Sequence, residues 1–165
     1  MKCKRAICSA TALCILMGSC SSTSAETTRE DSTDAAAAGG ALCSDVDVYA
    51  DGLEKTGPNG LVFRILRSDL NPPDRGVNTF YVELLQDGAK TDDYRLVAEP
   101  IMPLHGHGTF PTTFEASADE TSQYELGPMD LFMSGRWEIQ IDAVELDNEA
   151  ADAVDTITFA FCLEG

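Results

Sequence analysis

Basic residues are scarce in this chain. Its 165 residues include 11 Lys and Arg against 28 Asp and Glu, which gives a formal net charge of −17 at pH 7. A surface with this field repels phosphate backbones and anionic lipid headgroups, so nucleic-acid binding and charge-driven membrane docking are not expected. Metal cations and basic partners would be attracted. The alternative is an acidic surface that only maintains solubility.

The chain also lacks an apolar run long enough to cross a bilayer. Its first apolar segment, Ala6–Met17, has 12 residues and follows the basic residues Lys2, Lys4 and Arg5. A membrane-spanning helix needs about 20 residues. A basic start, a short apolar region and small residues after it are typical of a secretory signal peptide.

The end of this signal resembles a bacterial lipobox. The segment reads Met17-Gly18-Ser19-Cys20, with Met17 where such motifs usually have Leu. We therefore predict a lipoprotein signal peptide over residues 1–19 and a lipidated N-terminus at Cys20. Ser21 in place of Asp would direct the anchored protein to the outer membrane, facing the periplasm or the cell surface. The alternative is an ordinary signal peptide cut nearby, with Cys20 lost or unlipidated.

The remainder divides by composition into a tether and one domain. After Cys20, residues 21–40 are rich in Ser, Thr and Ala, end in Gly-Gly and have almost no large apolar side chains. Such a segment cannot bury enough surface to offset the entropy of ordering, so residues 20–40 are predicted to be a lipidated Cys with a flexible linker. Residues 41–165 have the length of a single domain.

Two cysteines remain for the domain. Of the six in the chain, three leave with the signal peptide and Cys20 forms the anchor. Cys43 and Cys162 stand at opposite ends of residues 41–165, and in an exported protein such a pair predicts a disulfide. The alternative is that their thiolates bind copper.

No stretch of the domain shows a sustained helical period, whereas several short stretches are apolar, β-branched or alternating. Expected strands cover residues 61–66, 79–85, 94–98, 110–116, 124–126, 136–143 and 156–162, with a first strand within residues 43–48. Turn signals rich in Gly, Pro and Asn separate them. We therefore predict an all-β fold, an immunoglobulin-like β-sandwich of about seven strands. Trp137 is predicted to plug one end of its core.

Both histidines of the chain lie in one segment, Met102-Pro103-Leu104-His105-Gly106-His107-Gly108. Alternating residues of an extended segment project to the same side, so His105 and His107 could chelate one ion. Imidazole and thioether ligands together suit copper. Copper binding would require the neutral imidazoles and would weaken in acid.

The sulfur ligands of the predicted site come from two segments. Met102 lies in the histidine segment itself, and Met133 would be carried to it by strand pairing in the sandwich. Met129 is a reserve candidate. The alternative is that Met102 ends a strand, Met133 fills the core and the histidines are idle.

The order of these motifs resembles the YtkA-like domain family, which is related to FixH-like domains. The matching residues span roughly residues 61–144 and are Met102, Pro103, Gly106, His107, Gly108, Pro111, Tyr124, Met133, Gly135 and Trp137. The resemblance implies a small immunoglobulin-like β-sandwich outside the cytoplasm, with a role in copper handling or respiratory oxidase assembly. Members of the family often have Met where this chain has His105, a change that makes Cu(II) more tolerable.

Catalysis is not expected. The only two histidines lie in one Gly-rich loop, the chain has no nucleophile elbow, and its two domain cysteines are expected to be paired. The acidic run Glu145–Glu149 lacks the spacing of a calcium loop. Two hypotheses remain, a lipid-anchored copper-binding domain of the cell envelope and a metal-free immunoglobulin-like module that binds another envelope protein.

Overall fold

The computed structural model describes residues 43–146 and 152–164. The predicted signal peptide, the lipidated Cys20 and the linker up to residue 40 lie outside these residues. The described residues form strands and no helix, so they hold no helix that could cross a membrane. The strands are β1 (Leu53–Thr56), β2 (Val62–Ser68), β3 (Gly76–Gln86), β4 (Ala89–Thr91), β5 (Tyr94–Met102), β6 (His107–Gly108), β7 (Phe114–Ser117), β8 (Tyr124–Leu131), β9 (Gly135–Glu145) and β10 (Asp155–Leu163).

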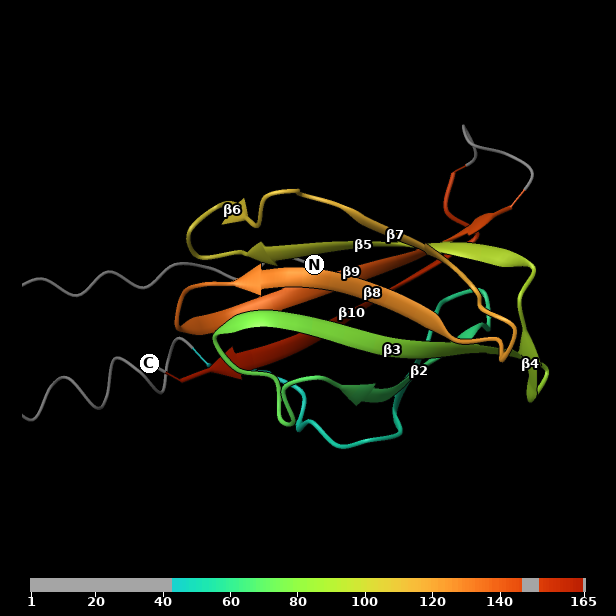
Figure 1. The fold of residues 1–165 in the computed structure, drawn as a ribbon, viewed down its shortest axis with the longest axis horizontal. Helices are drawn as coiled ribbons and strands as arrows, with labels where there is room; N and C mark the ends of the chain where they lie inside the picture. Colours follow the sequence, from blue (N-terminus) through green and yellow to red (C-terminus); the bar gives the residue numbers. More distant parts are fainter. Residues whose placement is uncertain (1–42, 147–151, 165) are drawn as a thin grey trace, which may run out of the picture. The chain divides into compact units, whose positions relative to one another are not determined.

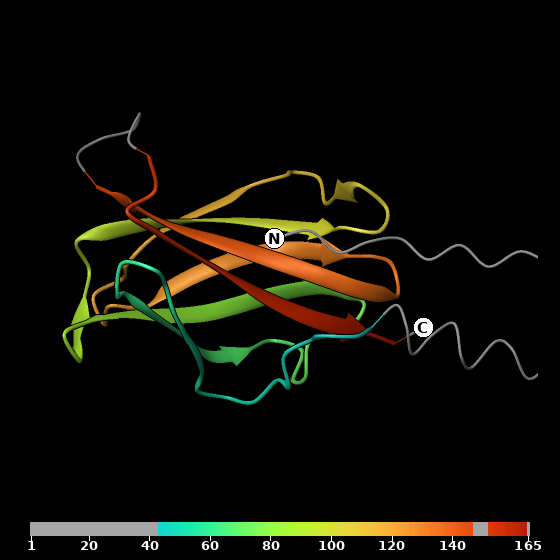
Figure 2. The ribbon, with the colours of Figure 1, turned by 180° about the vertical axis from the view of Figure 1, so that it is seen from behind.

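The strands form two antiparallel sheets that pack face to face as a β-sandwich (Figure 1). One sheet has the order β1-β2-β3-β4, with β8 also paired to β3, and the other has the order β10-β9-β5-β6, with β7 also paired to β5. Seen from behind, the long strands β9 and β10 lie side by side in the second sheet (Figure 2). The predicted immunoglobulin-like β-sandwich is therefore confirmed.

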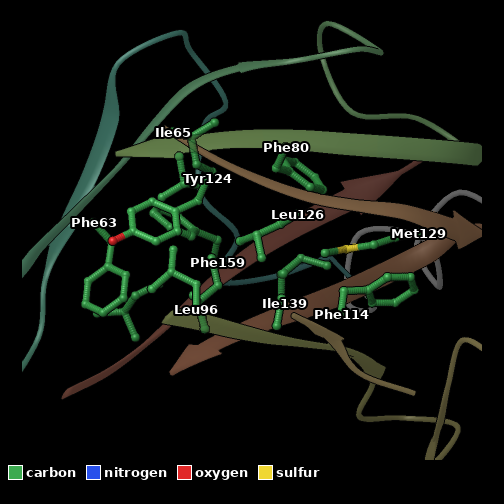
Figure 3. Packing of buried hydrophobic residues seen from close by; sticks show 14 of the residues in the cluster. Phe63, Ile65, Phe80, Leu96, Phe114, Tyr124, Leu126, Met129, Ile139 and Phe159 are labelled. Atoms are coloured by element: carbon green, nitrogen blue, oxygen red, sulfur yellow. The ribbon is translucent and has the colours of Figure 1, made fainter. Parts of the chain in front are cut away.

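The core follows from the period of two in the strands. In β9 the side chains of Trp137, Ile139, Ile141 and Ala143 are buried while the residues between them are partly exposed. Because successive side chains of a strand point to opposite faces, this alternation places one face of β9 against the other sheet. Large apolar residues of both sheets interdigitate there (Figure 3), among them Phe63, Phe80, Leu96, Phe114, Tyr124, Leu126, Met129 and Phe159. Trp137 is fully buried, as predicted.

Two expected strands are wrong in detail. Residues 43–48 form no strand. Their main-chain contact is a hydrogen bond from Asp47 N to Ala160 O, and the Asp47 carboxylate accepts the return bond from Ala160 N. In the expected strand 110–116, only Phe114 onward pairs with β5. Pro111 has no N–H for a ladder, and Thr109 Oγ1 instead donates to its carbonyl at 2.7 Å.

The short strands missed by the sequence pattern are β1, β4 and β6. Each has four residues or fewer, which is too short for a period to show. Their pairing is set by neighbouring long strands. The β6 strand in particular exists only because the chain folds back on Met102, and it carries His107.

The predicted disulfide joins Cys43 to Cys162, near the end of β10. The two Cα atoms are 5.5 Å apart and the residues are 119 positions apart in sequence. Near the disulfide, the Asp47 carboxylate also forms an ion pair with Lys55 Nζ, at 2.7 Å. The segment before β1 is thereby fastened along the outer edge of β10, which covers an edge that would otherwise offer free backbone groups.

A buried carboxylate ties β2, β3 and β4 together. Glu83 of β3 is 3% exposed, and its two oxygens accept hydrogen bonds from Arg64 Nη1 and Lys90 Nζ, each at 2.6 Å. Burial opposes ionisation and raises the pKa of Glu83. The hydrogen bonds and charges of Lys90 and Arg64 outweigh burial and hold this pKa below its ordinary value.

This depressed pKa predicts an acid-dependent contribution to stability. A carboxylate with a lowered folded-state pKa contributes stability above its unfolded pKa and loses it as the pH falls through the folded value. At pH 7, Glu83→Gln should lower the free energy of unfolding by about 1–3 kcal/mol, the range for hydrogen bonds to charged groups. The deficit, measured by urea unfolding, should shrink toward about pH 3, as the carboxyl group of the parent protonates. Glu54→Gln, which removes the exposed partner of Arg64, should cost less than about 1 kcal/mol. A deficit for Glu83→Gln that is equal at both pH values would contradict this assignment.

Candidate functional site

The two histidines lie on the tight hairpin that joins β5 to β6. Met102 pairs with His107, and the carbonyl of Met102 accepts hydrogen bonds from His105 N at 3.0 Å and Gly106 N at 2.9 Å. Gly106 has φ +65°, the left-handed conformation that glycine adopts at low cost. Gly108 has no room for a side chain, because a Cβ there would overlap the carbonyl oxygen of Pro100. The two glycines are therefore required by the hairpin.

This turn brings the imidazoles together. Their ring centres are 5.5 Å apart and their planes are inclined by 51°. An ion about 2.0–2.1 Å from one nitrogen of each ring would hold the centres roughly 5.2 Å apart at a tetrahedral angle. His105 and His107 are therefore neighbours, at a spacing compatible with one shared ion, but the expected extended segment is not found. The residue between them is in a left-handed turn, and the turn, not strand alternation, makes the rings neighbours.

The hairpin leaves both rings accessible. His105 is exposed and His107 is half-buried. His107 Nδ1 lies 3.4 Å from the carbonyl oxygen of Gly108, a long contact in which Nδ1 can donate a proton. When Nδ1 carries the proton, Nε2 has the free lone pair that a metal ligand needs.

A row of aromatic side chains contacts His107. Phe132, in the turn between β8 and β9, stacks on His107 with ring centres 5.8 Å apart and planes inclined by 12°. Phe132 meets the edge of Trp137 at 5.9 Å. Trp137 Nε1 donates to the carbonyl of Met133 at 2.9 Å, which fixes this turn. The turns after β5 and after β8 lie at the same end of the sandwich (Figure 1).

The predicted sulfur ligands are less available than the imidazoles. Met102 is 1% exposed, and its methyl group lies 3.1 Å from where a Cβ at Gly135 would stand. Met129, the reserve candidate, is completely buried in the core. Met133 is half-buried and packs against the core. Residues paired across antiparallel strands project from the same face of the sheet. Met102 and His107 therefore project from the same side of the hairpin, and the Met102 side chain is buried there.

Carboxylates do not complete the site. Among residues 43–146 and 152–164, no three His, Cys, Asp or Glu side chains are close enough to hold a metal together. Cys43 and Cys162 are joined to each other, so their thiolates are not ligands. Within the part of the chain that the structure describes, thioethers and backbone groups of this end are therefore the remaining candidate ligands beside the two imidazoles.

The residues that sequence reasoning missed are apolar. Leu104 at the hairpin tip is 64% exposed, Phe132 is 45% exposed and Phe110 is 97% exposed. They flank the histidine hairpin in sequence or in space. An aromatic residue in a turn between two strands was the available signal for Phe132, but its stacking on His107 depends on how the β8–β9 turn, which connects the two sheets, packs against the β5–β6 hairpin.

Comparison with known proteins provides no precedent for these features. The chain matches no protein-family model, no curated protein and no solved structure. Its resemblance to YtkA-like domains therefore stays an interpretation of its motifs.

Proposed function

We propose that this chain is a lipid-anchored protein of the cell envelope whose β-sandwich domain binds copper through His105 and His107. The observation that carries the proposal is the adjacency of the two imidazoles on an exposed hairpin, at a spacing that suits one shared ion. The lipobox at Cys20 supplies the anchor. The order of Met, His, Gly and Trp motifs adds a resemblance to a family linked to copper handling or oxidase assembly.

Copper suits this end of the domain better than other common ions. Two imidazoles with a nearby thioether form a borderline-soft set, which calcium and magnesium do not favour. Zinc would accept the imidazoles but gains little from sulfur. Met133, half-buried beside Trp137, is the thioether that could reach the surface by a side-chain rotation, whereas Met102 would need the hairpin to move.

The first test is a copper titration of the purified domain, residues 41–165, with Cu(I) and with Cu(II). His105→Ala/His107→Ala should weaken uptake at least ~10-fold, which corresponds to about 1.4 kcal/mol. Met133→Leu should reduce Cu(I) affinity more than Cu(II) affinity, because the softer ion gains more from a thioether.

A control is needed because an acidic surface attracts cations without a site. Glu115→Gln/Glu125→Gln removes two exposed carboxylates from β7 and β8 and leaves the hairpin intact. It should bind copper as the parent does. Equal uptake by the histidine variant and the parent would eliminate the copper function.

The second candidate function is a metal-free module that binds another envelope protein. The exposed Leu104, Phe110 and Phe132 favour it, since apolar side chains gathered near one end of a domain are typical of interaction surfaces. Under this alternative, Leu104→Ser and Phe132→Ser would abolish retention of a partner, while His105→Ala/His107→Ala would leave it intact. Under the copper proposal, the histidine variant is the one that loses function.

A further inference from the structure

A cleft lies at the same end of the sandwich as the histidine hairpin but is built by different elements. It has a volume of about 290 Å³. One wall comes from the segment before β1, one from the loop between β2 and β3, and the floor from the end of β10. Its chief lining residues are Tyr49, Pro72, Pro73, Asp74, Phe161 and Glu164. The disulfide half Cys162 also borders it, which fastens one wall covalently to the floor.

The apolar part of the cleft is rigid and aromatic. The ring of Tyr49 meets that of Phe161 edge to face, with centres 5.9 Å apart. Phe161 in turn stacks on the buried Phe80 at 5.8 Å. Tyr49 also donates its hydroxyl proton to Asp51 at 3.0 Å. Burial and the neighbouring carboxylate raise the pKa of Tyr49 to about 12, so the cleft keeps a neutral phenol.

The polar part of the cleft is wholly acidic. Of the three carboxylates that line it, Asp47 is already held by Lys55. Asp74 and Glu164 take part in none of the ion pairs formed by the described residues. The Asp74 carboxylate accepts only a backbone hydrogen bond, from Arg75 N at 2.7 Å. Two carboxylates beside aromatic rings therefore face the cleft with no cationic partner among the residues that the structure describes.

We propose that this cleft binds a small organic cation, an ammonium group carried on an apolar or aromatic body. The carboxylates of Asp74 and Glu164 would attract the charge, and the partly exposed ring of Tyr49 would accept the apolar body and a cation–π contact, with the buried Phe161 holding that ring in place. The volume of about 290 Å³ lies just below the usual range for ligand pockets, which is about 300–1,000 Å³. That size favours a small molecule over a helix or strand of a partner protein.

The test uses the purified domain, residues 41–165 with its disulfide intact, and a matched pair of probes. Phenethylamine carries a positive charge at pH 7, and 2-phenylethanol is its neutral analogue of nearly the same shape. Titration followed by amide chemical shifts should show saturable shifts around Tyr49, Asp74 and Glu164 with the amine. The alcohol should bind at least ~10-fold more weakly than the amine, and added salt should lower the affinity for the amine.

Matched variants locate the site. Asp74→Asn/Glu164→Gln should reduce amine affinity about tenfold, whereas Glu99→Gln/Glu125→Gln, with the same change of net charge elsewhere on the surface, should not. Tyr49→Phe keeps the ring and should retain binding, and Tyr49→Leu should lose it. Each variant is checked for the parent's circular dichroism and melting temperature, so that a loss of folding is not read as a loss of binding.

The outcomes separate this proposal from the copper function. His105→Ala/His107→Ala should bind the amine as the parent does, because the hairpin contributes nothing to the cleft. Equal affinity for the amine and the alcohol, or shifts that follow the histidine hairpin, would overturn the proposal. Tighter binding of a lysine-containing peptide than of any small amine would also overturn it, in favour of a protein partner.

Discussion

Replacing both bridging cysteines, Cys43→Ala with Cys162→Ala, should lower the free energy of unfolding by about 5 kcal/mol on the chain-entropy estimate for a loop this long. The bridge joins residues 119 positions apart, so its loss frees nearly the whole domain in the unfolded ensemble. Small domains have a total stability of about 5–15 kcal/mol, so the loss would be a large fraction of it. Urea unfolding with a circular-dichroism readout measures the change.

The control for this prediction is chemical. Reducing the parent protein without mutation should shift its unfolding midpoint as far as the double variant does, and should not shift the variant further. The native contacts of Asp47 with Ala160 and Lys55 remain in both, so the folded state keeps its fastening near β10. Coincident unfolding curves for the oxidised and the reduced parent would contradict a stabilising bridge.

The second large effect is expected at Trp137, where Trp137→Ala should lower the free energy of unfolding by about 3–5 kcal/mol, the range for truncating a buried aromatic side chain. Trp137 is fully buried, and its indole N–H fixes the β8–β9 turn through the carbonyl of Met133. The cavity left by alanine would also remove the edge contact that positions Phe132 against His107. If the proposed copper site exists, weaker copper binding by the folded fraction should accompany the loss of stability.

Two variants separate these effects. Trp137→Phe keeps most of the apolar volume and loses the hydrogen bond to Met133, so its cost should be nearer about 1–2 kcal/mol. Phe132→Ala removes a side chain that is 45% exposed, so it should cost little stability while loosening His107. If Trp137→Ala and Phe132→Ala proved equally destabilising, the role of Trp137 as the plug of the core would be wrong.

Most of the architecture could be predicted from the sequence, because the residue patterns that indicate a strand involve only neighbouring residues. Alternation in 136–143 and 156–162 appears in β9 and β10 with the buried faces predicted, because one buried sheet face forces a period of two. The disulfide could be predicted because only two cysteines, Cys43 and Cys162, lie in residues 41–165, which leaves one pairing. The prediction of a strand at residues 43–48 was wrong because the sequence pattern did not show that the Asp47 carboxylate, and not a backbone carbonyl, would accept the hydrogen bond from Ala160 N.

The site was only partly readable. The sequence identified the histidines, and its motif order suggested sulfur ligands. It does not show, however, whether a given methionine is buried in the core or lies at the surface. Burial separates them. Met102 and Met129 pack inside, and Met133 is the one left near the surface. The cleft beside the disulfide left no trace in the pattern, because its walls come from residues near positions 49, 73 and 162.

The sequence by itself determined an acidic chain with an all-β domain and a histidine pair in a glycine-rich turn, since charge, period and turn chemistry are properties of neighbouring residues. Tertiary structure alone decided that the two rings lie 5.5 Å apart, that Phe132 stacks on one of them and that two methionines are withdrawn into the core. The physical reason is that these relations depend on how the β5–β6 hairpin packs against the connection between the two sheets, and such contacts join residues that no local pattern connects.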